Sequence, residues 1–196
     1  MRVKICGITN YDDAMLCIDA GADALGFVFY PASPRYISPE NASLIISSLP
    51  PFVEKVGLFV EESVESIEKI SRESGITLAQ IHFDVDEEFI DSITFPTLPV
   101  VRASSPSDLK RFDGRYRLVD AFSASYGGSG KRLDLSWFDD IDREKIILAG
   151  GLTPDNLEEL RGYGFYGVDA SSATEASKGV KDPRKVRRFI ENAKSL

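Results

Sequence analysis

The cysteine that ends the first apolar segment is a candidate reactive side chain. The stretch VKICGIT places Cys6 after Val3 and Ile5 and directly before Gly7. A thiolate is a nucleophile and a base, whereas a free buried cysteine is usually an inert, small apolar side chain. The residue types alone leave both interpretations of Cys6 open.

Two aspartates lie within other apolar segments. Asp120 is in RLVDAF, and Asp169 is in YGVDASS. Because burying a charged carboxylate without a partner or a role is unfavourable, both are candidate acid–base or binding residues. The alternative for each is a helix N-cap or an ordinary loop carboxylate. Gln80, His82 and Arg102 lie at the ends of further apolar segments and are candidates for the same site.

Two short loops have the composition of an anion-binding site. One contains Gly150 and Gly151, and the other contains Ser171 and Ser172. Loops of this kind can turn several backbone N–H groups toward a phosphate. We expect these four residues to bind a phosphate group of a substrate.

A third glycine-rich stretch, SYGGSGK over 125–131, contains Gly127, Gly128 and Gly130. It lacks the G-x-x-x-x-G-K-[ST] spacing of a nucleotide-binding P-loop. We expect either a mobile loop that closes over a ligand or an ordinary flexible loop.

No metal or cofactor site is expected from the sequence. Cys6 and Cys17 do not have the spacing of zinc ligands, and His82 is the only histidine. No G-x-G-x-x-G motif of a dinucleotide site follows the first apolar segment. We therefore expect chemistry carried out by side chains alone.

Segments with the composition of β-strands alternate with helical or shortened segments along the chain. Strands separated by helices predict right-handed crossovers and a parallel sheet, and eight such units predict a closed (β/α)8 TIM barrel. We expect a single barrel domain over residues 1–196, with reactive residues at the carboxyl ends of the strands and a phosphate site after strands 7 and 8. The expected strands are 3–8, 24–29, 55–60, 78–83, 98–103, 116–122, 145–151 and 166–172.

Three residue pairs predict where outer helices begin. A Ser, Thr or Asp caps the first helical turn, and proline is favoured at the position that follows. The pairs are Ser38–Pro39, Thr153–Pro154 and Asp182–Pro183.

The segment between the fifth and sixth strands is too short for an ordinary barrel helix. Ala103 to Gly114 spans 12 residues, and Pro106 and its serines use up the turn. The remainder is about one helical turn at 1.5 Å per residue. We expect the fifth helix to be short or missing, with Leu109 and Phe112 filling the gap.

The overall charge argues against general binding to nucleic acid. Acidic residues number 31 against 23 basic ones, a net charge of −8, whereas a nucleic-acid-binding surface is expected to be basic. A basic cluster at helical spacing near the C-terminus is expected to be the solvated outer face of the last helix. The cluster is Lys181, Arg184, Lys185 and Arg188, and the opposite apolar face is Val186, Phe189, Ile190 and Ala193.

The cellular location is expected to be the cytoplasm. No apolar run approaches the roughly 18 residues of a membrane span, and two cysteines are too few for a disulfide scaffold. The first residues already have the composition of a strand, so we expect no signal peptide.

Together these motifs resemble the phosphoribosylanthranilate isomerase family over essentially the whole chain. The matching stretches are KICGIT, GADALGFVFYPASPRYISP, AQIH, LVDAFSASYGGSGK, LAGGL-P-N and VDASS. The resemblance implies a cofactor-free Amadori rearrangement in tryptophan biosynthesis. N-(5-phosphoribosyl)anthranilate would become 1-(2-carboxyphenylamino)-1-deoxyribulose 5-phosphate, in a monomer or a homodimer.

The resemblance also implies roles for individual residues. Cys6 matches the general base, Asp120 the general acid, Arg35 the residue that binds the anthranilate carboxylate, and Asp169 a residue near the substrate amine. A thiol with an ordinary pKa of about 8.5 would then need a shift toward thiolate, and we expect Cys6 to be exposed at the barrel mouth, with Gly7 leaving room beside it. Residues Gly150, Gly151, Ser171 and Ser172 match phosphate-binding loops, and Gln80 and His82 match a pair that lines the site.

Two positions depart from the family pattern. Ala173 stands where glycine is usual after the serine pair, which leaves the backbone of the phosphate loop in question. Phe83 stands where glycine is common after the histidine of the fourth strand, which puts the local turn in question.

Three other functions compete with this one. They are the related histidine-pathway aminoaldose isomerase, which uses a pair of aspartates and a substrate with two phosphates, a Cys–His hydrolase, and a non-catalytic phosphate-binding barrel. Cys6 in the base position disfavours the first, and the presence of both Cys6 and Asp120 disfavours the last. Nothing in the sequence supplies the third, orienting group of a hydrolase built on Cys6 and His82.

Overall fold

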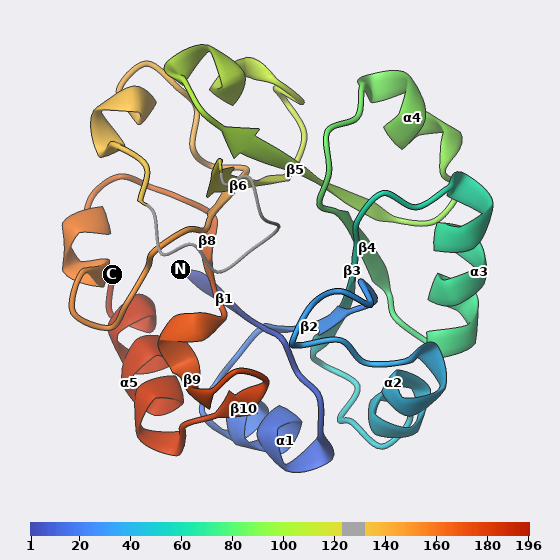
Figure 1. Ribbon diagram of the computed structural model, residues 1–196. Helices are drawn as coiled ribbons and strands as arrows, with labels where there is room; N and C mark the ends of the chain where they lie inside the picture. The colour runs from blue at the N-terminus through green and yellow to red at the C-terminus, as the bar shows by residue number, and fades with distance from the viewer. Residues whose placement is uncertain (123–131) are drawn as a thin grey trace.

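The strands form a closed parallel barrel in sequence order (Figure 1), which confirms the expected fold. The computed structural model describes residues 1–122 and 132–196. The barrel strands are β1 (Arg2–Cys6), β2 (Ala24–Val28), β3 (Glu54–Phe59), β4 (Leu78–Ile81), β5 (Thr97–Ala103), β6 (Arg117–Ala121), β7 (Ile146–Leu148) and β8 (Gly167–Ala170).

The barrel closes where β1 pairs with both β2 and β8. Cys6 lies opposite Gly26 on β2, and Lys4 lies opposite Asp169 on β8. Side chains two residues apart on a strand point to the same face. Lys4 and Cys6 therefore share one face of β1, and the contacts of Lys4 with Asp169 place that face inside the barrel.

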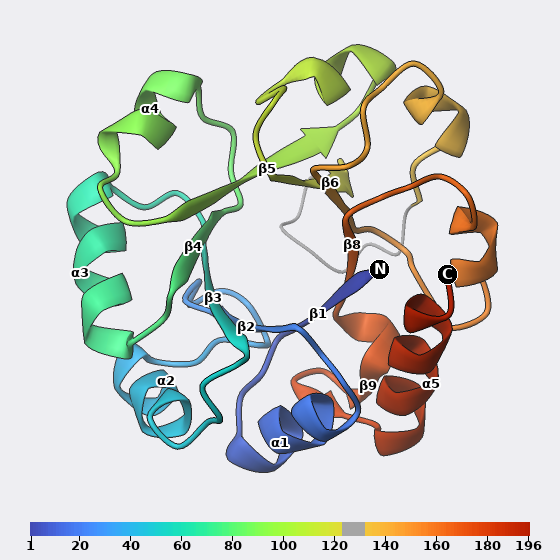
Figure 2. The ribbon, with the colours of Figure 1, turned by 180° about the vertical axis from the view of Figure 1, so that it is seen from behind.

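The α-helices lie outside the ring of strands in both views (Figures 1 and 2). The helix starts expected at Ser38 and Asp182 are confirmed, because both side chains accept hydrogen bonds from N–H groups of the first turn. The helices are α1 (Tyr11–Asp19), α2 (Pro39–Ile46), α3 (Val64–Ser74), α4 (Glu87–Ser92) and α5 (Pro183–Lys194).

In place of a fifth barrel helix, the chain forms a short 3₁₀ turn at Pro106–Lys110. Leu109 and Phe112 are buried beside it. The expectation of a vestigial fifth helix is therefore confirmed.

The expectation of a helix that starts at Thr153 is wrong. The Thr153 N–H donates to Oδ1 of Asn156, and a 3₁₀ turn follows only at Leu157–Leu160. The Asn156 side chain also donates through Nδ2 to the Gly151 carbonyl at 2.9 Å, so it fixes residues 151–153 as a loop, and winding begins only after Asn156. The segment before β7 is similarly short, with a 3₁₀ turn at Leu135–Phe138.

A small hairpin lies between β8 and α5. Its strands are β9 (Glu175–Ser177) and β10 (Val180–Lys181), and Gly179 between them has a φ of +81°.

The expectation that Lys181 belongs to the solvated face of the last helix is wrong. Lys181 is buried in β10, before the Asp182 cap, whereas Arg184, Lys185 and Arg188 are exposed on α5.

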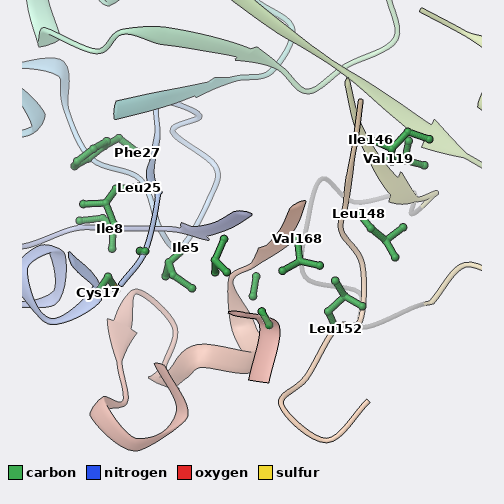
Figure 3. Packing of buried hydrophobic residues seen from close by; sticks show 14 of the residues in the cluster. Ile5, Ile8, Cys17, Leu25, Phe27, Val119, Ile146, Leu148, Leu152 and Val168 are labelled. Atoms are coloured by element: carbon green, nitrogen blue, oxygen red, sulfur yellow. The ribbon is translucent and has the colours of Figure 1, made fainter. Parts of the chain in front are cut away.

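The main core lies between the strands and the outer elements (Figure 3). Ile8 and Leu25 lie close to Cys17 of α1 in this view, and all three are fully buried. Burial raises the pKa of the Cys17 thiol to about 12, which makes Cys17 an inert apolar side chain.

Within the described part of the chain, no helix combines the length and the apolar character needed to cross a bilayer.

Candidate active site at the carboxyl-terminal mouth of the barrel

The carboxyl ends of the strands bring most of the expected site residues together. Arg102 lies opposite Asp120 across β5 and β6, as Lys4 lies opposite Asp169 across β1 and β8. Below them, an apolar cluster built on Leu98, Val100, Leu118 and Ala149 fills part of the barrel interior. Polar residues at the strand ends above an apolar layer form the usual active-site geometry of this fold.

The surroundings of Cys6 explain the glycines next to it, but not as expected. A Cβ atom at Gly26 would lie 2.8 Å from the Cys6 sulfur, so the thiol occupies the space of a missing side chain. Gly7 has a φ of +85°, and a Cβ there would lie 2.6 Å from Cδ of Arg35. Gly7 therefore makes room for Arg35. The expected exposure of Cys6 is wrong, since the residue is only 5% exposed.

The expected shift of Cys6 toward thiolate is also wrong. Burial raises the pKa of the thiol, and the nearby charge of Asp169 raises it further. The cations Lys4, Lys181 and Arg35 lower that pKa without overcoming the burial. The thiol is therefore the stable form at neutral pH.

Asp120 is suited to donate a proton. Burial raises its pKa to about 6, with a further contribution from the charge of Asp169, against opposing effects of Arg102 and Lys4. A carboxyl group with a pKa near the working pH is partly protonated there and still gives up its proton readily, as a general acid must.

Gln80 and His82 form a hydrogen-bonded pair beside Asp120. Gln80 Nε2 lies 3.0 Å from His82 Nδ1, and as its donor it leaves the histidine proton on Nε2. Nε2 lies 3.9 Å from Oδ2 of Asp120. Burial lowers the pKa of His82 to about 3, with help from Lys4 and Arg102, so the ring is neutral and presents an N–H group to the site.

Lys4 is a charged residue of the site that the sequence reasoning missed. Its Nζ lies 2.8 Å from Oδ1 of Asp169, and both side chains are nearly buried. Burial lowers the pKa of Lys4, but Asp169 and Cys6 outweigh this effect and raise it, so the ammonium group stays charged. A lysine inside the apolar segment VKIC is the same signal that drew attention to Asp120, and it could have identified Lys4.

Arg35 lies in the loop after β2 and is held by a second residue that was missed. Its Nε and Nη2 each donate to a carboxylate oxygen of Glu175 at 2.7 Å. Nζ of Lys181 also lies near this carboxylate, 3.5 Å from Oε1 of Glu175. Nothing in the sequence distinguishes Glu175 or Lys181 from surface charges.

The expected phosphate loops lie side by side after β7 and β8. Gly150 and Gly151 have positive φ angles of 85° and 62°, a backbone conformation that glycine adopts readily. The Ser171 hydroxyl is buried, points toward Gly7, and has no hydrogen-bond partner among the described residues. An unpartnered buried hydroxyl is unfavourable unless a ligand satisfies it.

Two departures from the family pattern are accommodated locally. Ala173 lies with Ser172 in a short 3₁₀ turn at Ser172–Thr174 and does not have the positive φ that would require glycine. Phe83 packs edge-on against Phe89 of α4, with ring centroids 5.6 Å apart. The glycines Gly127, Gly128 and Gly130 lie outside the described residues.

Within residues 1–122 and 132–196, no group of three or more His, Cys, Asp or Glu side chains is arranged to hold a metal ion. The fold and the strand-end residues define a TIM-barrel enzyme with a carboxyl group and a thiol at its mouth.

Comparison with known proteins gives the particular family. The chain matches the family described as N-(5'phosphoribosyl)anthranilate (PRA) isomerase over residues 3–192. It is 65% identical over 196 residues to the N-(5'-phosphoribosyl)anthranilate isomerase of Sulfurovum sp. (strain NBC37-1), with 100% of both chains covered. The chain therefore belongs to the phosphoribosylanthranilate isomerase family, and it is an isomerase of tryptophan biosynthesis.

Solved structures agree with this assignment. The phosphoribosyl anthranilate isomerase of Thermotoga maritima is 40% identical with a TM-score of 0.92, and 100% of each chain is covered. Another such isomerase, in complex with reduced 1-(o-carboxyphenylamino)-1-deoxyribulose 5-phosphate, is 37% identical with a TM-score of 0.88, again with 100% of each chain covered. The expected activity is confirmed, and the three competing functions are set aside.

Proposed function

We propose that the chain rearranges N-(5-phosphoribosyl)anthranilate to 1-(2-carboxyphenylamino)-1-deoxyribulose 5-phosphate, with Asp120 as general acid, Cys6 as general base and no cofactor. The observation that carries this assignment is the Asp120 carboxyl, whose pKa burial raises to about 6, in the same barrel mouth as the buried Cys6 thiol. β6 and β1 are separated by β7 and β8, so the two groups reach a substrate from different sides.

The first step needs an acid. Asp120 donates its proton to the furanose ring oxygen as the C1–O bond breaks, and the anilino nitrogen supplies the electron pair of the new C1=N bond. The second step needs a base. The Cys6 thiolate takes the proton from C2, whose electron pair forms a C1=C2 bond while the C1=N electrons return to nitrogen. The enolamine then becomes the ketone: its C2 hydroxyl proton passes to the Asp120 carboxylate, and C1 takes the proton held by the Cys6 thiol, so both groups return to their starting forms.

The remaining polar groups account for the ends of the substrate. The Arg35 guanidinium suits the anthranilate carboxylate, because its planar fork matches two carboxylate oxygens. Gly150, Gly151, Ser171 and Ser172 suit the phosphate, and the unpartnered Ser171 hydroxyl supports that role.

The middle of the substrate would face the remaining strand ends. Asp169, held by Lys4, suits the amine. Gln80 and His82 would line the site next to Asp120, with the neutral ring as a hydrogen-bond donor.

We infer that the chain acts as one barrel domain in the cytoplasm. We also infer that it is a monomer or a homodimer and that it has no nucleic-acid partner. The Thermotoga maritima relative is a dimer from which monomers have been generated. In this chain, the fully exposed Phe52 lies at a cavity of about 700 Å³ at the amino-terminal end of the barrel, which supports contact with a second copy. The net charge of −8 supports the absence of a nucleic-acid partner.

Turnover of phosphoribosylanthranilate, followed by the change in anthranilate fluorescence, tests the assignment. Cys6→Ser and Asp120→Asn should each lower kcat by at least about a hundredfold, since general acids and bases contribute about 10²–10⁴. Cys17→Ser is the matched control and should keep kcat, because Cys17 lies in the outer core. Near wild-type kcat in either active-site variant would show that the residue has been given the wrong role.

A further inference from the structure

Three charged side chains are buried together behind the barrel mouth. Arg35, Glu175 and Lys181 have side chains that are 12%, 4% and 0% exposed. Lys181 and Glu175 come from the β10 and β9 strands of the hairpin, and Arg35 comes from the loop after β2. Ion pairs this deep persist only when the geometry is good and further hydrogen bonds satisfy the charges.

Glu175 fixes the plane of the Arg35 guanidinium. It accepts from Nε and Nη2, both at 2.7 Å, so it occupies one edge of the planar fork. A third donor, the Gly179 N–H, holds Oε1 of Glu175 at 3.3 Å. A guanidinium has five N–H groups in one plane, so those of Arg35 that do not face Glu175 keep a fixed direction.

Lys181 joins this pair to the reacting strand. Its Nζ donates to the Cys6 carbonyl at 2.6 Å and to Oγ1 of Thr174 at 3.3 Å, and it lies 3.5 Å from Oε1 of Glu175. Two positive groups and one negative group leave the cluster with an excess of one positive charge. The cluster is therefore complementary to one anion.

We propose that Glu175 and Lys181 are positioning residues that aim Arg35 at an anionic group of the substrate. Glu175 holds the guanidinium in the direction needed for that anion, and Lys181 keeps Glu175 charged and fixed against the end of β1. The inference rests on the proposed role of Arg35 in binding a carboxylate. The phosphate is the other anion within the same substrate, and the test separates the two.

The sign of the effect distinguishes positioning from simple charge. Removing the negative charge of Glu175 makes the site more positive, so a pure charge effect would lower KM for an anionic substrate. Loss of the fixed orientation of the Arg35 guanidinium would raise KM instead. Because the contact exists in both ground and transition states, kcat should change little.

The first variant is Glu175→Gln, assayed with phosphoribosylanthranilate. We expect KM to rise about tenfold or more, the size expected when a hydrogen bond to a charged group is lost, and kcat to stay within about threefold. In an Arg35→Ala background, which itself raises KM, the same substitution should have no further effect. Asp91→Asn is the control, because Asp91 also holds an arginine through two contacts, with Nη1 and Nη2 of Arg115 at 2.8 and 3.1 Å, on the surface of α4.

A second test is the double variant Glu175→Gln with Lys181→Met. It keeps the wild-type excess of one positive charge but lacks the carboxylate that orients Arg35. Its KM should stay raised, and recovery to the wild-type value would overturn the proposal. This variant also covers the case in which Glu175→Gln alone does not fold, since its net charge in the cluster equals that of the wild type.

Inhibition shows which anion Arg35 receives. Anthranilate should inhibit Glu175→Gln about tenfold less well than the wild type, whereas inhibition by inorganic phosphate should be unchanged. The reverse pattern, or a lower KM in Glu175→Gln, would overturn the proposal. Failure of the proposed function looks different: wild-type protein without turnover would refute the activity, and Arg35→Ala with unchanged KM would refute the role of Arg35.

Discussion

Burial raises the pKa of both reactive side chains, which favours the acid and opposes the base. The pKa of Asp120 is raised to about 6, so a useful fraction of it is protonated near neutral pH. The pKa of Cys6 is raised as well, so its thiol stays protonated in the neutral range. The reacting pair of a carboxylic acid and a thiolate is therefore a minor form of a state that carries one proton in total. Coupled groups of this kind titrate as a pair, and the steps seen in a pH profile belong to the pair.

This arrangement predicts the pH dependence of kcat/KM. Below about pH 6 both Asp120 and Cys6 are protonated, so no thiolate forms and the rate falls. Above the raised pKa of the thiol both groups are ionised, so no acid remains and the rate falls again. Between these limits the pair holds one proton and kcat/KM is level.

The Asp120→Asn variant tests whether Asp120 causes the fall of kcat/KM below about pH 6. Its residual rate depends only on the thiolate, so kcat/KM should rise with pH up to the thiol pKa without a step near pH 6. Measurement of both profiles by fluorescence is the test. A step near pH 6 that survives in Asp120→Asn would belong to another group.

At the scale of elements, the local capping signal located the start of the last helix correctly. Asp182 and Pro183 start α5 as expected, because the cap accepts from the N–H groups of Arg184 and Lys185. The same cap explains the error at Lys181. Its spacing to Arg184 and Arg188 fits a helix, but it precedes the cap and belongs to a strand.

The site was predictable where a polar residue interrupts an apolar strand, as at Asp120 and Asp169. The contacts of these residues were not predictable, because partners such as Lys4 and Asp169 are 165 residues apart and meet only through the fold. The same holds for Arg35 and Glu175, which are 140 residues apart. The pKa direction of Cys6 was missed for the same reason, since it depends on burial by several strands.

The missing fifth helix has a consequence for local stability. On the outer side of β5 and β6, Leu109 and Phe112 replace a full helix, whereas α5 packs against β1. Segments with fewer buried contacts open more easily. Amides of β5 and β6 should therefore exchange with solvent faster than those of β1 and β2. Native-state hydrogen exchange measures this, and equal or slower exchange in β5 and β6 would show that the short segment covers the strands as well as a helix does.

At the scale of the whole molecule, one carboxylate ties the first strand to the last helix. Asp23 accepts from Nη1 of Arg2 at 2.7 Å and from the Val3 N–H at 2.8 Å, and it also pairs with Lys194 near the end of α5. Burial raises the pKa of Asp23, but the bonds from Lys194, Arg2 and Val3 outweigh it and lower the pKa below its usual value. The barrel is closed by β1 and β8, so this junction holds together the two ends of the chain beside that seam.

The lowered pKa fixes the sign of the pH dependence of stability. A carboxyl whose pKa is lower in the folded state stabilises the fold above its unfolded value of about 3.9 and loses that contribution as the pH falls through the folded value. Asp23→Asn should lower the free energy of unfolding by about 1–2 kcal/mol at pH 7, because it weakens charged hydrogen bonds, and the difference from wild type should shrink below about pH 4. Asp155→Asn is the control, since Asp155 pairs with Arg188 of α5 with both side chains largely exposed, and such pairs contribute little. Urea unfolding of the three proteins at pH 7 and pH 3 measures the differences. An equal loss for Asp23→Asn at both pH values would mean that the residue stabilises the junction through packing and not through its charge.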